Sequence, residues 1–452
     1  MLRHYWRELG ATISLGVPIV VGQVSQMLMG VTDSLMIGHA GAVPLAASAF
    51  GGNIFNIFYV LGLGIMVPVA VCVARAHGAG RRDEAGEYLR HGIALSVGFG
   101  VAEVLLLVVL CTQLGRFGQP PEVLAIVRPF FLLIGMSLVP VLMYLAFRQF
   151  AEAMGRPWMP MCIMLGSVAL NAGLNWVFIF GHLGVPALGL TGAGISTLAS
   201  RIAATLALLV WVRHDPVTRA AWPRRWTAVW STPRFREMLR VGLPAATMLF
   251  FECTAFAWST IMMGWLGAVP LAAHQIAITC ASVAFMFPLG ISMAAGMRVS
   301  HALGAGETAR LRWIGLAALS LALATTATFA VAFAGFGRDI AQWFVREPDV
   351  VAVATHLLMV AALFQLFDGC QVNAASMLRG MMDVRVPAAL TLVAYWGIAL
   401  PIGYAAGVRG HFGPIGIWLG IAIGLAFAAL TLVARFLRRT RMVQSGWPQR
   451  TA

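Results

Sequence analysis

The stretch Gly41-Ala42-Val43-Pro44-Leu45-Ala46-Ala47 occurs twice in the chain, and the second copy runs from Gly267 to Ala273, 226 positions later. Other Gly and Pro residues match at the same offset without a gap: Pro18 with Pro244, Gly38 with Gly264, Gly64 with Gly290, and Gly78-Ala79-Gly80 with Gly304-Ala305-Gly306. A looser match at offset 225 places Met154-Gly155 opposite Arg379-Gly380. Chance likeness between apolar segments would not keep Gly and Pro in constant register. The chain therefore contains two copies of one unit of roughly 220 residues.

The composition identifies the class of protein. Apolar residues make up 60% of the chain, charged residues make up 11%, and the mean hydropathy is +0.84. Apolar segments of at least ~20 residues recur along the whole length, which is long enough for helices that cross the hydrocarbon core of a bilayer. They are too long for barrel strands and lack alternation with period two. The sequence therefore predicts an all-α integral membrane protein.

Several kinds of chemistry are excluded or disfavoured by residue usage. All 31 basic residues are Arg, so the chain has no Lys for a Walker A phosphate loop or a Schiff base. The six cysteines are scattered singly and show no zinc-binding spacing, so we expect buried packing thiols. The net charge of +14 could indicate nucleic acid binding, but the Arg residues lie in loops between apolar spans. Membrane orientation explains that placement better.

We predict twelve spans, at 12–37, 45–72, 91–112, 127–148, 160–181, 190–212, 241–264, 271–297, 313–335, 352–378, 387–407 and 414–436. The N-terminus, the loops after even-numbered spans and the C-terminal tail hold 25 Arg, whereas the alternate loops hold five. Because basic loops stay inside, both termini are predicted to be cytoplasmic. No cleavage site follows a short apolar run, so the first span is expected to remain as an anchor.

The domain organisation follows from the repeat. We predict an N-terminal six-helix lobe at 1–212, a basic cytoplasmic linker at 213–240, a C-terminal six-helix lobe at 241–436 and a cytoplasmic tail at 437–452. Six spans per copy give both halves the same orientation, related by an axis along the membrane normal, with a cavity where they meet.

Two acidic residues in the second half lie at one depth. By the ~1.5 Å helical rise, Glu252 lies roughly 16 Å from the cytoplasmic end of its span and Asp368 roughly 15 Å from the end of its own. Ionisable groups at membrane depth are functional candidates by default. Neighbouring carboxylates either share a proton or hold a cation, which is what an ion-coupling site requires. The alternative is two separately satisfied carboxyl groups.

The first half has its candidate acidic residue at a different position in the repeat. Asp33 lies about 31 Å up its span by the same helical rise, and its repeat equivalent is Ser259, whereas Glu252 lies opposite Gln26. Asp33 is either a functional acid or a helix-end residue. Asn171 and Asn175 are spaced i, i+4 and share one face. Their amides could bind an acid or a ligand, or join helices.

Three further polar residues lie in predicted spans. Glu103 has no obvious partner, and we interpret it as a buried protonated carboxyl. Arg201 is expected to pair with an acid or with helix ends. His274, which precedes Gln275, is interpreted as a hydrogen-bonded structural residue, although a histidine could titrate near neutral pH.

The motifs together resemble a known family. The run Met29-Gly30-Val31-Thr32-Asp33-Ser34-Leu35-Met36-Ile37-Gly38, the GAVPLAA stretch that follows it and the Gly-Ala-Gly loop at 78–80 resemble the multidrug and toxic compound extrusion (MATE) transporters. Three further segments resemble the same family: residues 171–181, the Phe251-Glu252 pair, and residues 364–368 leading to Leu378-Arg379-Gly380. The resemblance covers roughly 12–436 and is strongest for the NorM-type branch.

The resemblance implies twelve helices in two pseudo-symmetric six-helix bundles around a V-shaped cavity, and export of bulky, often cationic and aromatic drugs in exchange for Na⁺ or H⁺. By position, Glu252 and Asp368 match the second-lobe cation site, which would hold Na⁺ as its metal ion in a sodium-coupled member. Asp33 matches the first-lobe acid, and Asn171 and Asn175 match its polar partners. Gln275 resembles a substrate-facing position. Phe285 stands where some members have a Tyr near the cation, so a hydroxyl ligand is missing there and Na⁺ is less strongly indicated.

We therefore expect a multi-pass inner-membrane antiporter rather than an enzyme, with small organic molecules and membrane lipid as its partners, no cofactor beyond the coupling ion, and no nucleic acid. A monomer suffices, since the fused lobes already form the cavity. One alternative is a flippase for lipid-linked precursors from the same wider superfamily, which requires a strongly basic cavity, whereas only Arg201 lies within a span. The other alternative is a membrane enzyme, for which no metal cluster or nucleophile motif is visible.

Overall fold

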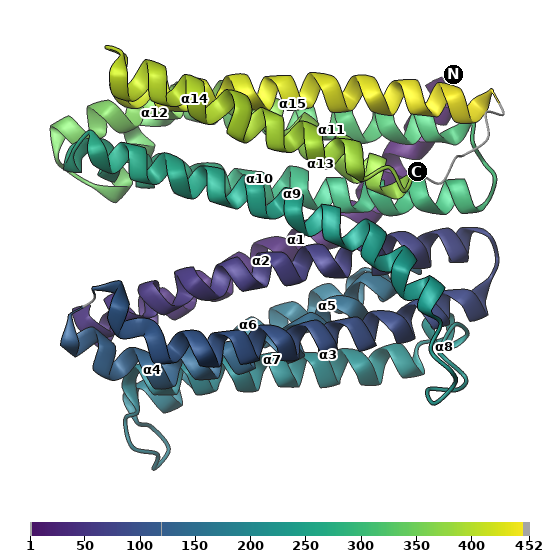
Figure 1. Cartoon of the computed structure of the whole chain (residues 1–452), viewed down its shortest axis with the longest axis horizontal. Helices are drawn as coiled ribbons and strands as arrows, with labels where there is room; N and C mark the ends of the chain where they lie inside the picture. The colour runs from purple at the N-terminus through teal and green to yellow at the C-terminus, as the bar shows by residue number, and fades with distance from the viewer. Residues whose placement is uncertain (1, 119, 446–452) are drawn as a thin grey trace. The chain divides into compact units, whose positions relative to one another are not determined.

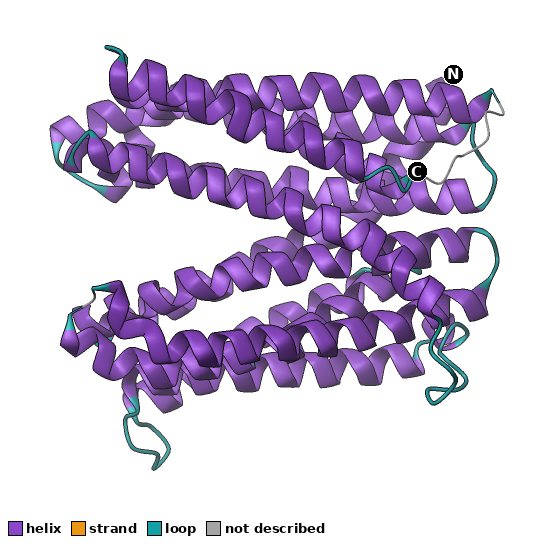
Figure 2. Ribbon diagram, viewed as in Figure 1, coloured by secondary structure: helices purple, strands orange, loops and turns teal. Residues whose placement is uncertain are grey.

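The part of the chain that the structure describes is mostly helical. The computed structural model describes residues 2–118 and 120–445, and within them twelve helical segments are long and apolar enough to cross a membrane (Figure 2). This confirms the prediction of an all-α protein with twelve spans.

The helices are drawn in Figure 1. In the first copy they are α1 (Leu2–His39), α2 (Ala42–Gly78), α3 (Arg82–Gln113), the short η1 (Leu114–Phe117), α4 (Pro121–Met136), α5 (Leu138–Ala153), α6 (Trp158–Phe180) and α7 (Gly189–His214). A single turn, α8 (Pro216–Arg219), follows. The second copy contains α9 (Thr232–Trp265), α10 (Ala268–Gly304), α11 (Arg310–Phe344), α12 (Pro348–Gly380), α13 (Arg385–Leu392), η2 (Val393–Ala399), α14 (Leu400–Gly403), η3 (Tyr404–Arg409) and α15 (Gly413–Gln444).

The repeated GAVPLAA stretch begins the second helix of each copy. Gly41 and Gly267 precede α2 and α10 with φ angles of 133° and 115°, a backbone conformation that favours glycine. Pro44 and its equivalent Pro270 lie in the first helical turn, where the missing N–H has no intrahelical acceptor to lose. The Gly and Pro of this motif therefore recur because they begin a helix immediately after a tight turn.

Two predicted spans are interrupted in the structure. The span predicted at 127–148 is divided into α4 and α5 at Ser137, and the span predicted at 387–407 alternates between α-helix and π-helix from α13 to η3. Most helices also extend beyond the predicted ends, as α1 does by starting at Leu2 instead of near residue 12. Hydropathy detects the apolar centre of a helix but not the polar turns that continue it into the interface.

The chain forms two compact units that do not coincide with the two copies. Unit 1 contains the residues up to Val20 together with those from Thr247 onward, and unit 2 is Val21–Ala246. The unit boundaries, Val21 and Thr247, are themselves 226 positions apart (247 − 21). The start of α1 thus belongs to the unit built mainly from the second copy, and the start of α9 belongs to the unit built mainly from the first.

Within unit 1, α12 is the central helix, since it packs against α10, α11 and α15. Close approach of α15 to the interrupted span depends on glycine, because a Cβ at Gly420 would lie 2.4 Å from the backbone nitrogen of Gly403. Within unit 2, α2 packs against α3, α4 and α5, and α7 packs against α4, α5 and α6.

An ionic cluster holds the first turns of α1 in unit 1. The Glu8 side chain is 2% exposed, and Arg310 Nε donates to its Oε1 over 2.8 Å. Arg298 donates to the other carboxylate oxygen of Glu8 and to the hydroxyl of Thr12. Arg7 also lies near the same carboxylate, at 3.8 Å, but is largely exposed.

The cysteines are free in the described residues, as the sequence indicated, but they are not all buried. Cys72 and Cys111 are buried, whereas Cys162 and Cys253 are exposed. The expectation of buried thiols is therefore wrong for these two. Both lie in helices long and apolar enough to cross a membrane, and a small apolar thiol carries little penalty in apolar surroundings.

Candidate functional site

The two acids of the second copy are brought together in unit 1. Glu252 lies on α9 and Asp368 on α12, and the two carboxyl groups interact electrostatically. Asp368 is 6% exposed, and its Oδ1 has no hydrogen-bond partner among the described residues, whereas Glu252 is half-buried. The two carboxyl groups therefore affect each other's charge, and Asp368 is not fully satisfied by hydrogen bonds within the described residues.

Several buried polar groups on α12 and on the interrupted span from α13 to η3 also lack hydrogen-bond partners within the described ranges. They are both amide atoms of Gln371 and the hydroxyls of Thr391 and Tyr395. Gln371 is three residues after Asp368, and Tyr395 is four residues after Thr391, so each pair shares a helix face. Tyr395 interacts electrostatically with both Glu252 and Asp368. Buried oxygen atoms without partners are uncommon in proteins and are suited to a bound cation.

Tyr395 supplies a hydroxyl that Phe285 lacks. Phe285 on α10 is half-buried and offers only a ring, while the Tyr395 hydroxyl comes from the interrupted span. Sequence reasoning missed Tyr395 and Gln371, although Thr391 and Tyr395 are the polar pair of the span predicted at 387–407. The spacing i, i+4 was the available signal.

His274 and Gln275 have different surroundings. Trp418 Nε1 donates to His274 Nδ1 over 3.1 Å, and His274 Nε2 lies 3.0 Å from the Thr260 hydroxyl. An indole N–H can only donate, so Nδ1 accepts and the proton of the neutral ring is on Nε2. Both ring nitrogens of the buried His274 are thus hydrogen-bonded, which agrees with the prediction of a hydrogen-bonded structural residue. Gln275 is exposed, and none of the described contacts links it to the acid pair.

In unit 2, Asp33 is the centre of a second polar site. Asn175 Nδ2 donates to Asp33 Oδ1 over 2.6 Å and also to Asn171 Oδ1 over 3.3 Å. The Thr197 hydroxyl is 3.5 Å from Asp33 Oδ2 but donates over 2.9 Å to the carbonyl of Ala193, which is the better acceptor. Asn171 and Asn175 are fully buried, and Asn175 links Asn171 to Asp33.

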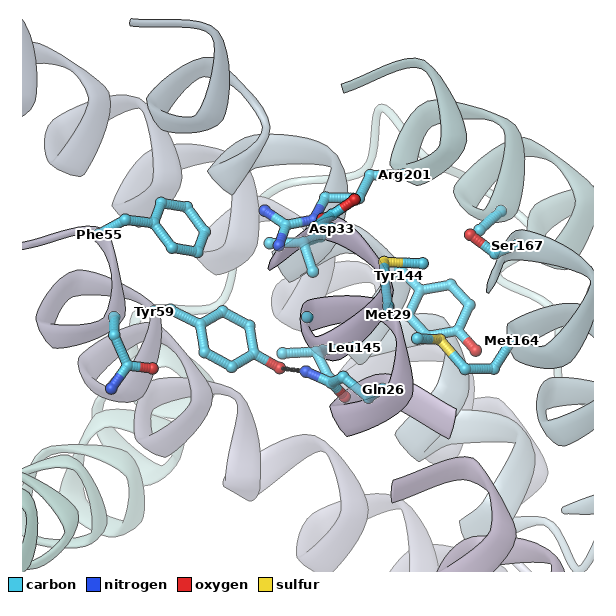
Figure 3. A pocket seen from close by; sticks show the side chains of 14 residues that line it. Gln26, Met29, Asp33, Phe55, Tyr59, Tyr144, Leu145, Met164, Ser167 and Arg201 are labelled. Carbon is cyan, nitrogen blue, oxygen red and sulfur yellow. Dashed lines mark hydrogen bonds between the residues drawn. The ribbon is translucent and has the colours of Figure 1, made fainter. Parts of the chain in front are cut away.

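Asp33 lines a cavity of about 200 Å³ within unit 2. Figure 3 shows its walls, which combine charged and polar groups with the rings of Phe55, Tyr59 and Tyr144. The rings of Phe55 and Tyr59 are nearly parallel, with centroids 6.1 Å apart, and Gln26 donates to the Tyr59 hydroxyl. The cavity therefore offers flat apolar surfaces beside a carboxylate.

Arg201 also lines this cavity, and Glu103 does not. Arg201 Nη1 donates to the Ser137 hydroxyl over 2.6 Å, at the break between α4 and α5. This agrees with the expectation that Arg201 interacts with helix ends. Glu103 is buried on α3 beside Gly62, and neither of its carboxyl oxygens has a partner among the described residues. The structure gives Glu103 no connection to either site.

Comparison with known proteins identifies the family. The family model MatE matches residues 18–177 and again 244–405, and the two matches begin 226 positions apart (244 − 18), which is the offset of the internal repeat. The chain belongs to the MATE family. It is therefore a membrane transporter and not an enzyme.

Relatives of this MATE transporter match over nearly its whole length. A probable multidrug resistance protein NorM of Mesorhizobium japonicum is 34% identical over 97% of this chain and 96% of its own. The multidrug resistance protein PmpM of Pseudomonas aeruginosa is 32% identical over 96% of this chain and 92% of its own. These matches place the transporter in the NorM-type branch.

The fold agrees with solved MATE structures. A multidrug resistance MATE transporter of the MOP superfamily superimposes with a TM-score of 0.90 and 20% identity, covering 97% of each chain. At this identity the likeness shows the fold alone. It confirms the predicted class, a multi-pass membrane protein built from two six-helix bundles.

Proposed function

We propose that this MATE transporter exports bulky, often cationic and aromatic small molecules by antiport with Na⁺ or H⁺ through alternating access. The observation that carries the proposal is the linked pair Glu252 and Asp368, set among buried polar atoms without partners in the described part of unit 1. The multidrug resistance names of the NorM and PmpM relatives support the kind of substrate.

The proposed coupling is a competition for negative charge. When both carboxylates are ionised, they attract an organic cation from the cytoplasmic side. Na⁺ or H⁺ that enters from outside neutralises them, weakens drug binding and promotes release. Because binding free energies are reciprocal, the same interaction makes the drug weaken ion binding.

Unit 2 contributes a second acid to this mechanism. Asp33 serves as a further coupling carboxylate, and Asn171 and Asn175 position it through the hydrogen bonds described above. Gln275 and Phe285 are proposed to contact substrate on the second-copy side, Phe285 through its ring face. The proposal needs only one copy of the chain and no cofactor.

The proposed location is the bacterial inner membrane, with both termini in the cytoplasm. The concentration of Arg in the loops after even-numbered spans supports this orientation. Helices α9 and α15 fit it, since each carries several Arg at its proposed cytoplasmic end.

The flippase alternative is not favoured by the cavity. Arg201 is the one basic residue among the described residues that line the cavity containing Asp33. A lipid-linked pyrophosphate carries several negative charges and is usually bound by a group of basic side chains.

The test uses purified protein in proteoliposomes with a fluorescent organic cation inside and an imposed gradient of either Na⁺ or H⁺. We expect one gradient to drive export, and Asp368→Asn to abolish the gradient-dependent part. Asp349→Asn is the matched control, since it makes the same change at an exposed position of α12. Gradient-driven export that survives in Asp368→Asn at the wild-type rate would remove Asp368 from the coupling mechanism.

A further inference from the structure

The loop that joins the two copies is folded against one end of α3. Residues 222–231, which we call the strap, lie between α8 and α9 (Figure 1). Arg90 of α3 is buried, and its guanidinium donates over 2.7 Å to the carbonyl of Ala228. The same guanidinium lies 3.2–3.3 Å from three further strap carbonyls, those of Arg225, Trp226 and Val229. One buried side chain thus holds the backbone of the strap in a defined conformation.

Both ends of the strap are also anchored in unit 2. The Ser231 N–H donates to His91 Nε2 over 3.1 Å, and the Trp230 ring meets the His91 ring edge to face. At the other end, the Trp222 ring stacks on the ring of Phe147 from α5. The strap is therefore a built part of unit 2 rather than a loose connection between α7 and α9.

The face of α3 that the strap covers continues along the helix as an exposed apolar stripe. The exposed residues of this stripe share the face of Arg90 at helical spacing: Val97, Val101, Leu105 and Val108. Val97 follows Arg90 by two helical turns, which is about 10 Å along the axis. Because α3 is long and apolar enough to cross a membrane, such a stripe is suited to contact with lipid chains. The strap thus covers the same face where it approaches the level of the lipid headgroups.

The outer side of the strap combines apolar side chains with positive charge. Val229 is 93% exposed, and Trp226 and Trp230 are exposed beside it. The exposed arginines of the strap and its flanks are Arg219, Arg224, Arg225 and Arg236. Arg224 lies 3.4 Å from Asp83, but both side chains are largely exposed, so the pair is weak. Trp is enriched where a bilayer meets water, and clustered Arg attracts anionic headgroups.

We propose that the strap is a binding surface for anionic phospholipids of the adjacent leaflet. Trp226, Val229 and Trp230 insert among the headgroups. Arg224 and Arg225 bind the lipid phosphates through charge-assisted hydrogen bonds. The buried clamp on α3 positions the strap and does not itself touch lipid. This inference goes beyond the proposed antiport and does not depend on which ion is coupled.

A strap that only connects α7 to α9 predicts something different. Its arginines would then set the membrane orientation and nothing more, so the charge of the surrounding lipid would not alter the strap. A site for a soluble phosphate compound would act without a bilayer. Lipid charge and the presence of the bilayer are therefore varied separately in the test.

The experiment measures hydrogen exchange by mass spectrometry on strap peptides of the full-length transporter, held in nanodiscs of phosphatidylcholine with or without phosphatidylglycerol. We expect phosphatidylglycerol to slow exchange in the strap and to leave peptides of α12 unchanged. One Arg near an anionic surface strengthens binding about 5-fold, so Arg225→Gln should reduce the slowing by up to about 5-fold. Arg441→Gln is the matched control, since it makes the same change at an exposed Arg of α15, and it should retain the slowing.

Val229 allows the sign of the charge to be tested without disturbing the fold, because its side chain packs against little of the protein. Val229→Asp brings negative charge to the headgroups and should abolish the slowing, whereas Val229→Arg should retain or increase it. Equal exchange in these two variants, or no effect of phosphatidylglycerol on the wild type, would overturn the proposal. Equal slowing by soluble glycerol phosphate on the detergent-solubilised transporter would also overturn it, since a bilayer would then not be needed.

Failure of this inference and failure of the proposed function give different results. Exchange is measured without a drug or an ion gradient, so a wild type that shows no gradient-driven export would still show the lipid effect. Loss of the lipid effect alone leaves gradient-driven export from phosphatidylcholine proteoliposomes intact.

Discussion

Glu8 offers the sharpest test of how the start of α1 is held in unit 1. The change is Glu8→Ala, which removes the carboxylate that Arg298 and Arg310 share. The Arg298 side chain is 10% exposed, so the change leaves a nearly buried guanidinium without its acid. We expect the first 20 residues to detach from unit 1 more readily while the rest of the unit stays folded.

The magnitude follows from the burial of the two arginines. Breaking a buried ion pair by removing one partner costs about 3–5 kcal/mol. The lower end applies here, because Arg310 is 30% exposed and its contribution is screened by solvent. A loss of about 3 kcal/mol raises the detached population roughly 100-fold.

The assay is hydrogen exchange measured by mass spectrometry on peptides from residues 8–20, because local opening controls exchange of these backbone amides. Glu8→Ala should accelerate their exchange by about two orders of magnitude, with peptides from α12 unchanged. Arg7→Ala is the control, since Arg7 is largely exposed and 3.8 Å from the same carboxylate. Wild-type protection in Glu8→Ala, or equal acceleration in Arg7→Ala, would refute the reasoning.

Three further predictions concern unit 1. Gly420→Ala should abolish or strongly lower the yield of folded protein on size-exclusion chromatography, because its Cβ would lie 2.4 Å from the Gly403 nitrogen. Trp418→Phe leaves the buried Nδ1 of His274 without a donor and should lower the free energy of unfolding by about 1–3 kcal/mol, seen as a lower Tm. Tyr395→Phe removes the hydroxyl near Glu252 and Asp368 and should raise the ion concentration for half-maximal dye export several-fold without lowering the maximal rate.

Matched substitutions check each of these outcomes. Gly173→Ala makes the same change within a helix where nothing lies within 4 Å of the new Cβ, so folded yield should be retained. Trp396→Phe removes a 3.3 Å bond from an exposed indole and should shift Tm less than Trp418→Phe. An unchanged ion dependence in Tyr395→Phe would contradict a role for that hydroxyl in ion binding.

The sequence was informative where Gly, Pro and charge break an apolar background. Glycine and proline in constant register revealed the duplication, and hydropathy located all twelve spans. Asn171 and Asn175 could be paired by their spacing, and Glu252 and Asp368 by their equal depth. These inferences depend on helix geometry, which is regular enough to be counted along the chain.

Other features depend on packing between distant residues and have no local signal. The break at Ser137 and the π-helical turns around Tyr395 arise in apolar segments that look continuous. The joint placement of Arg201 and Asp33 in one cavity requires α7 and α1 to be positioned in three dimensions. Arg201 was therefore interpreted as structural, because its sequence neighbours say nothing about the space in front of it.

The mutual exchange of the opening turns of α1 and α9 has a consequence for genetic dissection of the chain. A gene cut between α8 and α9 would yield two polypeptides, each lacking a piece that its principal bundle requires and carrying a piece that belongs to the other. Neither fragment should fold stably when it is expressed alone, whereas co-expression of both fragments should give a functional transporter. Complementation by the two gene fragments therefore tests whether the first turns of α1 and α9 belong to the opposite units.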